Sequence, residues 1–256
     1  MIDFEIPEET KLVRGIVREF VHDVCIPAEK GLTVDTYDKI LSELRQKARA
    51  KGLWCPFFPV EWGGMGLKPL ANALVQMELG ESILGALALN TQGPDDATMM
   101  TLLHHGTEYQ HEAFLRPLVA GEKRVCYAMT EKGGGADATG MKTSAVEDGD
   151  NYVLNGDKWY ISSANVANIA VVMAKTDPDA PRHQQFSTFI VELPNPGFKI
   201  LRNIDTMHRH TPLGERLGAA HCEIEINNLI VPKANLLGGR GQGFNMGQHR
   251  LGYGRL

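Results

Sequence analysis

Up to about Gly121, apolar residues recur every three or four positions, which is the spacing of one face of an α-helix. The first such stretch predicts a helix whose apolar stripe comprises Leu12, Val13, Ile16, Val17, Phe20, Val21 and Val24. Because its large apolar side chains fall on that stripe, we expect this helix to leave little apolar surface exposed.

Turn and capping residues predict where further helices begin and end. A second helix is expected after Asp35 and ends at Gly52, because glycine adopts the left-handed conformation that closes a helix. Its apolar face comprises Ile40, Leu41, Leu44 and Ala48. Pro69 suits the first turn of a third helix. The apolar positions of that helix are Leu70, Leu74 and Met77.

Two more helices complete the first part of the chain. One is expected to stop at Gly106, and Thr107 is placed to cap the next. Their apolar positions are Met99, Leu102 and Leu103, followed by Phe114 and Leu118. We therefore expect residues 1–121 to form an α-helical bundle.

Beyond Gly121 the apolar period shortens toward two, which indicates β-strands in residues 122–240. An apolar run that reads as a strand leads into Tyr127, and further strands are expected within residues 168–176, 186–193 and 221–231. The dipeptides Asp148-Gly149 and Asn155-Gly156 are placed as two corners of hairpins. A last helix is expected to open at Phe244, within residues 241–256, with nothing to pack on.

Composition narrows the function classes only slightly. The 256 residues are 43% hydrophobic and 22% charged, which is ordinary for a soluble globular protein. A net charge of -5 gives no basic footprint for nucleic acid, and no apolar stretch is long enough to cross a bilayer. We expect a bacterial cytoplasmic protein or one of a mitochondrial or peroxisomal matrix. The four cysteines form no CxxC pair and are expected to be buried thiols.

A glycine-rich segment, YAMTEKGGGADATG at residues 127–140, follows the strand that leads into Tyr127. It lacks the Lys-Ser/Thr end of a P-loop and leads into more strand, which excludes both a P-loop and a Rossmann phosphate loop. Two interpretations remain open: a plain loop between strands, or a loop whose backbone N–H groups and Thr130 hydroxyl meet a flat, phosphate-bearing cofactor.

A second segment, LNGDKWYISSANVAN at residues 154–168, carries two aromatic rings and two hydroxyls. In a regular strand Trp159 and Tyr160 point to opposite faces, so one ring enters the core and the other is free to cover a planar ligand. Ordinary packing of both rings within the sheet is the alternative.

Four segments in order resemble the acyl-CoA dehydrogenase family, over essentially the whole chain. They are KGLWCPFFPVEWGGMGL, EAFLRPLVAGEKRVCYAMTEKGGGADATG, YVLNGDKWYISSA and INNLIVPKANLLGGRGQGF. The second is similar to the family's YAMTEPGAGSDA and the third to its NGxKxWITNA. The resemblance implies an α+β fold: an N-terminal helical bundle, a middle β-sheet or β-barrel domain on the flavin side, and the start of a third, helical domain.

The resemblance also implies an FAD site. By position, the segment Tyr127, Ala128, Met129 and Thr130 would offer main-chain N–H groups and a hydroxyl to the polar edge of the flavin. Tyr160 and Ile161 would flank the ring, and the Ser162 hydroxyl would bond to its N5 atom. Gly135 and Ala136 fall in the loop that meets the cofactor phosphates, where Ala136 would also meet the substrate.

Two positions in that loop depart from the family pattern. Ala136 replaces a serine that contacts the cofactor pyrophosphate and CoA, which removes a contact of roughly 0.5–1.5 kcal/mol. Lys132 replaces a proline, which frees the loop and adds a cation near the phosphates.

The resemblance places the catalytic glutamate in the third domain, and no Asp or Glu follows Glu225 in this sequence. We therefore expect no catalytic residue in this chain, which would be a piece of a longer polypeptide or be completed by a partner. His249 is the only base in the last segment, and an exposed polar residue is the simpler interpretation. Arg255 matches an arginine that contacts CoA in relatives, with a solvated side chain as the alternative.

The implied reaction converts an acyl-CoA thioester into the trans-2-enoyl thioester and passes electrons through FAD to an electron-transferring flavoprotein. It belongs to fatty acid β-oxidation, and the full-length form would be a dimer or tetramer. An acyl-CoA oxidase, or a catalytically silent relative that only binds, are the alternatives.

Overall fold

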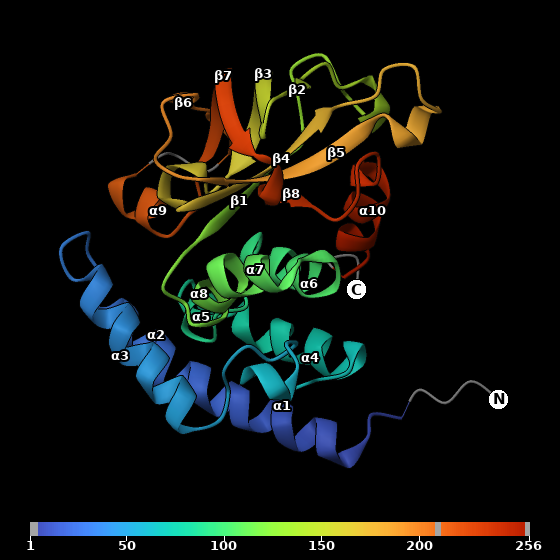
Figure 1. Ribbon diagram of the computed structural model, residues 1–256. Coiled ribbons are helices and arrows are strands. Elements are labelled where there is room, and N and C mark those ends of the chain that lie inside the picture. The colour runs from blue at the N-terminus through green and yellow to red at the C-terminus, as the bar shows by residue number, and fades with distance from the viewer. Residues whose placement is uncertain (1–4, 208–210, 254–256) are drawn as a thin grey trace. The chain divides into compact units, whose positions relative to one another are not determined.

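The computed structural model describes residues 5–207 and 211–253, and it separates into two compact units. The first ends at Asp96 and the second begins at Ala97. The first unit is helical, whereas the second combines helices with an eight-stranded sheet, so the chain has the expected α+β class (Figure 1).

The first unit is built from the longer helices α1, α3 and α4, and from shorter elements between and after them. Its elements are α1 (Glu8–Phe20), a π-helical turn (Val21–Cys25), α2 (Ile26–Glu29), α3 (Tyr37–Ala50), a 3-10 turn (Val60–Trp62), α4 (Pro69–Leu79) and α5 (Gly85–Ala88). Gly52 lies just past α3 at φ +70°, and Pro69 is the first residue of α4. Both predicted boundaries are therefore confirmed.

The apolar faces predicted for α1 and α4 are partly wrong. Leu12 and Ile16 of α1 are 65% and 38% exposed, and Leu70 and Met77 of α4 are 55% and 62% exposed. In α1 the buried side chains include Val17. The predicted apolar stripe is wider than the face of the helix that is buried, and Leu12 and Ile16 lie at its exposed edge. In α4 the buried side chains are those of Val75, Glu78 and Leu79.

Helices open the second unit. They are α6 (Asp95–His105), which begins at the boundary, α7 (Glu108–Gln110), a π-helical turn (His111–Leu115) and α8 (Arg116–Val119). Thr107 caps α7 as predicted: its hydroxyl accepts from the Gln110 N–H at 3.2 Å, and the Gln110 side chain accepts from the Thr107 N–H at 3.2 Å. This reciprocal pair satisfies two backbone donors at the start of the helix.

One mixed sheet forms the rest of the second unit. Its strands are β1 (Val125–Ala128), β2 (Ser144–Asp148), β3 (Asn151–Ser162), β4 (Ile169–Lys175), β5 (Phe186–Glu192), β6 (Phe198–Asn203), β7 (His221–Pro232) and β8 (Leu236–Leu237). The order is β6-β7-β3-β2-β4-β5-β8, and β1 pairs with β4 off this path. Strands β1 and β2 run parallel to β4, and the other pairs are antiparallel. The strands expected at residues 168–176, 186–193 and 221–231 are confirmed.

Only one of the two predicted hairpin corners is a corner. Asp148 pairs with Asn151 across a tight turn with Gly149 at φ +55°. Gly156, in contrast, lies within β3, at a register irregularity in the pairing with β7. A Cβ atom there would approach the Thr143 Oγ1 to 2.5 Å, so this glycine lets the residue just before β2 approach β3 closely and does not reverse the chain.

Helix α10 (Gly243–Tyr253) has a packing partner, contrary to the expectation. Met246 is 2% exposed, and a Cβ atom on Gly243 would approach the Phe186 carbonyl of β5 to 2.9 Å. In Figure 1 the helix lies beside β5. The remaining short elements are 3-10 turns at Ala138–Gly140, Ala164–Val166, Arg182–Gln184 and Lys233–Asn235, and α9 (Pro212–Arg216).

The four cysteines are buried free thiols, as expected. Burial raises the pKa of Cys25 to about 12 and that of Cys55 to about 11, so these thiols stay protonated and unreactive at neutral pH. Among the described residues, no helix combines the length and the apolar character that crossing a membrane requires.

Candidate functional site

The site begins where β1 ends. Strand β1 pairs with β4 up to Ala128, so Met129 and Thr130 lie beyond the ladder. The Thr130 carbonyl accepts from the Trp159 N–H at 2.8 Å, which holds this segment beside β3. Among the described residues, no main-chain or side-chain acceptor takes a hydrogen bond from the Met129 or Thr130 N–H. Two adjacent backbone donors are therefore available at one end of a strand.

A buried ion pair lies under this segment. The Lys158 side chain is fully buried, and its Nζ donates to the Glu131 carboxylate at 2.9 Å and to the Met129 carbonyl at 3.0 Å. The Glu131 carboxylate also accepts from the backbone N–H groups of Lys142 at 2.6 Å and Thr143 at 3.0 Å. These bonds fix the Met129 carbonyl toward the interior.

The electrostatics of this pair keep Glu131 ionised. Burial by itself raises the pKa of the Glu131 carboxyl, but the Lys158 charge and the three hydrogen bonds outweigh it and hold the pKa below its ordinary value. Burial lowers the pKa of Lys158, and the neighbouring Glu131 charge opposes that shift. Each group therefore compensates the desolvation of the other.

The two aromatic residues of β3 do not point to opposite faces, so that expectation is wrong. The β3–β7 register shifts between Lys158 and Ile161, and Tyr160 takes φ +55°. This bulge inserts one extra residue on β3 between the inward-facing Lys158 and Ile161, so the alternation of side chains fails there. The rings of Trp159 and Tyr160 meet edge to face with centroids 5.3 Å apart, and Tyr160 is 46% exposed.

The two residues that follow Tyr160 have different surroundings: Ile161 enters the core, and Ser162 bonds to a histidine on β7. Ile161 is 2% exposed and belongs to the core, so a ligand can meet only its main chain. Ser162 pairs directly with His221 of β7, and its Oγ lies 2.9 Å from the His221 Nδ1. The Tyr160 ring centroid lies 6.4 Å from that of His221.

The glycine-rich loop is tied down at its far end. Gly135 takes φ +50°, and Ala136 is exposed. Asp137 forms an ion pair with Arg182, and the Thr139 hydroxyl and N–H both donate to the Asp137 carboxylate. Hydrogen bonds from Thr139 are the main reason that the pKa of Asp137 is lowered.

Lys132 does not contribute a spare cation to this loop, contrary to the expectation. It forms an ion pair with Glu223, which also bonds to Arg202 at 2.8 Å. The Lys132 ammonium lies 4.7 Å from the centroid of the Trp159 ring. The Lys132 ammonium is therefore paired with a carboxylate on β7.

The other candidates lie elsewhere. The His249 ring lies 5.6 Å and 5.7 Å, between centroids, from those of His104 and His105. Within residues 5–207 and 211–253, no group of three or more His, Cys, Asp or Glu side chains is placed to hold a metal ion. Arg255 lies outside the described residues.

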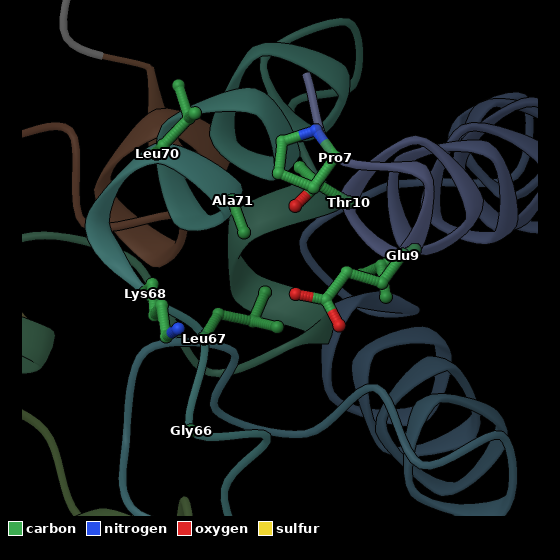
Figure 2. A pocket seen from close by; sticks show the side chains of 9 residues that line it. Pro7, Glu9, Thr10, Gly66, Leu67, Lys68, Leu70 and Ala71 are labelled. Atoms are coloured by element: carbon green, nitrogen blue, oxygen red, sulfur yellow. The ribbon is translucent and has the colours of Figure 1, made fainter. Parts of the chain in front are cut away.

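Two surface hollows are separate from these residues. One, of about 320 Å³, lies between the first turns of α1 and α4, with the Glu9 carboxylate turned into it near Leu67 (Figure 2). Another, of about 470 Å³, is lined by Asn165 and residues 193–200. Neither contains a predicted site residue.

Sequence reasoning missed the Lys158–Glu131 pair and His221. The Lys158–Glu131 pair was predictable in part. Lys158 stands beside aromatic and apolar strand residues, and a lysine that is buried there needs an acidic partner. His221 carried no such signal, because its pairing with Ser162 depends on the register of β7 with β3 across a bulge.

Comparisons with known proteins identify the family. The model of the acyl-CoA dehydrogenase N-terminal domain matches residues 7–122, and that of the middle domain matches residues 126–229. A probable acyl-CoA dehydrogenase of Mycobacterium tuberculosis is 40% identical over 228 residues, covering 86% of this chain and 53% of the relative. Acyl-CoA dehydrogenase family member 10 of the mouse is 36% identical over 265 residues, covering 98% of this chain and 24% of the relative.

The fold is matched as well. The structure of a putative acyl-CoA dehydrogenase from Mycobacterium abscessus superposes with a TM-score of 0.88 at 30% identity, covering 98% of this chain and 65% of that chain. This chain thus spans about a quarter of the mouse relative and about half of the Mycobacterium tuberculosis relative. With both domain models matched in order, the chain belongs to the acyl-CoA dehydrogenase family and carries its N-terminal and middle domains.

Proposed function

We propose that this chain forms the flavin-binding part of an FAD-dependent acyl-CoA dehydrogenase. The observation that carries the proposal is the pair of uncommitted backbone donors at Met129 and Thr130, held beside β3 by the bond from the Trp159 N–H to the Thr130 carbonyl. Tyr160, Ile161 and Ser162, which the family pattern also assigns to the flavin, lie on that stretch of β3.

The donor set suits the polar edge of a flavin. Reduction places negative charge on the pyrimidine edge of the ring, and preorganised N–H donors stabilise such charge without reorganising. The Ser162 hydroxyl adds a group that both donates and accepts, and the half-exposed Tyr160 ring offers an apolar surface beside it. Ala128 is buried in the strand, so it and Tyr127 position the donors that follow.

Bound FAD would supply the two-electron oxidation of the acyl chain, while the residues of this chain bind and orient. Met129 and Thr130 would hold the polar edge of the flavin, Tyr160 and the Ile161 main chain would flank its ring, and Ser162 would meet its N5 side. Gly135 and Ala136 would meet the phosphates, and Ala136 and Arg255 would meet the CoA portion of the substrate. A carboxylate from outside this chain removes the α-proton, which the thioester carbonyl acidifies.

The substrate class is an acyl-CoA thioester, and the product is the trans-2-enoyl thioester of fatty acid β-oxidation. Electrons pass on to an electron-transferring flavoprotein, and the complete protein is an oligomer. Because the chain spans about half or less of the curated relatives named above, these properties belong to the whole protein.

Flavin binding tests the proposal directly. Purified protein is titrated with FAD, and binding is followed by flavin absorbance and fluorescence. We expect saturable uptake that Tyr160→Ala weakens several-fold, whereas Tyr109→Ala does not change it. Tyr109 is a matched control, because it is 52% exposed in the same unit, against 46% for Tyr160, and it lies on α7. Protein that takes up no FAD contradicts the proposal.

Turnover separates the possible activities. With the complete polypeptide, bleaching of the flavin by acyl-CoA and transfer to an added electron acceptor supports a dehydrogenase. Oxygen consumption without an acceptor indicates an oxidase. Bound FAD that acyl-CoA never bleaches indicates a binding protein.

A further inference from the structure

The Ser162 hydroxyl has an unusual kind of partner for a serine in a strand. It bonds to a histidine ring nitrogen, the Nδ1 of His221 at 2.9 Å. A neutral imidazole nitrogen either donates or accepts, depending on which nitrogen carries the proton. The next residue gives the contrast: the Ser163 hydroxyl donates to the Gly218 carbonyl at 2.8 Å, so its only proton is committed. Ser162 is not committed in this way.

The backbone holds this pair in place. Ser162 and His221 are direct partners in the β3–β7 ladder, next to the pair of Ile161 and Cys222. The Ser163 N–H donates to the Ala220 carbonyl at 2.9 Å and continues the pairing beyond them. Both residues are half-buried, and the Tyr160 ring borders the histidine. The backbone therefore fixes the position of the Ser162 hydroxyl beside the proposed flavin, and the ring nitrogen to which it bonds can act as donor or as acceptor.

The chemistry of the proposed ligand requires such reversibility. The N5 atom of an oxidised flavin accepts a hydrogen bond, whereas the reduced ring carries a proton there and donates one. A hydroxyl whose proton is committed to a carbonyl can serve only the second state. When the His221 Nδ1 donates, the Ser162 proton is free to point to the ligand, and when Nδ1 accepts, the Ser162 oxygen is free to accept from it.

We propose that His221 is a positioning residue that reverses the direction of the Ser162 hydroxyl, so that one side chain serves both redox states of the flavin. This inference rests on the proposed function and deepens it. The alternative is an ordinary cross-strand hydrogen bond that stabilises the sheet and nothing else.

Two substitutions of His221 separate these roles. In His221→Asn the side-chain amide occupies about the position of Nδ1 and both donates and accepts, whereas in His221→Gln the amide lies near the Nε2 position. We expect His221→Gln to raise the FAD dissociation constant by about three- to tenfold. The Ser162 hydroxyl then loses its hydrogen bond to Nδ1, which orients it toward the flavin. His221→Asn should stay within about twofold of the wild type.

A double-mutant cycle shows whether His221 acts through Ser162. If it does, Ser162→Ala/His221→Gln binds FAD no more weakly than Ser162→Ala alone. Equal effects of His221→Gln with and without the Ser162 hydroxyl would overturn the inference and leave the proposed flavin site intact.

Nitrogen NMR of the wild-type protein, labelled at histidine, needs no variant. With oxidised FAD bound we expect the His221 proton on Nδ1, and after chemical reduction with dithionite we expect it on Nε2. The same tautomer in both states overturns the inference. Failure of the unmodified protein to bind FAD overturns the proposed function and this inference with it.

Discussion

At the scale of single residues, the most consequential interaction is the one between Lys158 and Glu131. A fully buried ammonium requires a buried partner, and this pair spans the β3 strand and the segment that follows β1. Because the Lys158 ammonium also donates to the Met129 carbonyl, it fixes the orientation of the Met129–Thr130 peptide, whose own N–H is the Thr130 donor. The pair therefore links stability to the geometry of the site.

Removing one partner of this pair should be strongly destabilising. We expect Lys158→Met to lower the free energy of unfolding by about 3 to 5 kcal/mol, because the Glu131 carboxylate stays buried without its counter-charge. Urea denaturation at neutral pH measures the change.

The double variant provides the control. Lys158→Met/Glu131→Gln removes the uncompensated charge, so it should lose clearly less stability than the two single changes added together. Additive losses would show that the two side chains do not act as a pair.

The sequence predicted which strand carries the candidate residues better than it predicted their orientation. Tyr160 and Ser162 came from a motif and lie on β3, which the bond from the Trp159 N–H to the Thr130 carbonyl joins to the segment after β1. The directions of the Trp159 and Tyr160 rings were predicted from regular alternation, which a bulge between Lys158 and Ile161 abolishes. A bulge is decided by pairing with β7, more than fifty residues further along the chain, so local spacing did not indicate it.

At the scale of elements, a single carboxylate joins α1 to α4. Glu78 of α4 is 2% exposed and accepts from Arg14 at 2.5 Å and from Arg18 at 2.8 Å, both on α1. Hydrogen bonds from Arg18, more than any other contact, lower the pKa of Glu78 to about 2, although burial opposes the shift.

This ion pair should make the stability of the first unit sensitive to acid. In the unfolded chain the Glu78 carboxyl takes up its proton near pH 4.5, whereas in the folded chain it does so only near pH 2. The contribution to stability is therefore complete above pH 4.5 and is lost as the pH falls toward 2, by roughly 3 kcal/mol in all.

Urea denaturation at several pH values, on the wild type and on Glu78→Gln, measures this contribution. We expect the difference in stability between the two proteins to shrink as the pH falls below 4.5. A difference that stays constant down to pH 3 would contradict the role given to Glu78.

A second prediction at this scale concerns Gly156. A methyl group there would meet Thr143 at 2.5 Å, and the residue takes φ +155°. We expect Gly156→Ala to lower the free energy of unfolding by about 1 to 3 kcal/mol through overpacking.

Gly149→Asn is the matched control for thermal or urea unfolding. Gly149 takes φ +55° in the β2–β3 turn with nothing within 4 Å of an added Cβ, and asparagine tolerates that conformation. Its stability should change by no more than about 0.5 kcal/mol. Equal losses in the two variants would contradict the close approach of Gly156 and Thr143.

The sequence alone predicted most helices and strands, because capping residues and apolar periods act locally. Gly52 predicts where α3 ends, and Pro69 and Thr107 predict where α4 and α7 begin. The sequence was less successful where pairing with a distant strand decides the structure. The dipeptide Asn155-Gly156 has the composition of a turn but lies within β3, because Asn155 pairs with β2 and Gly156 pairs with β7.

At the scale of the whole molecule, the chain carries two domains of one family. The family was recognisable from four segments spread along the sequence, which include the glycine-rich loop after β1 and the motif on β3. The ion pair under the loop and the Ser162–His221 bond depend on contacts between distant segments, so only the structure revealed them. The central claim is that backbone donors at the end of β1 hold the flavin.

Amide NMR during a titration with FAD tests that claim most directly. Hydrogen bonds from the Met129 and Thr130 N–H groups to the flavin should shift their two proton signals downfield and slow their exchange with solvent as FAD saturates the protein. The Trp159 N–H, which already donates to the Thr130 carbonyl, should shift less. Saturation with FAD while the Met129 and Thr130 signals stay unchanged would contradict the account.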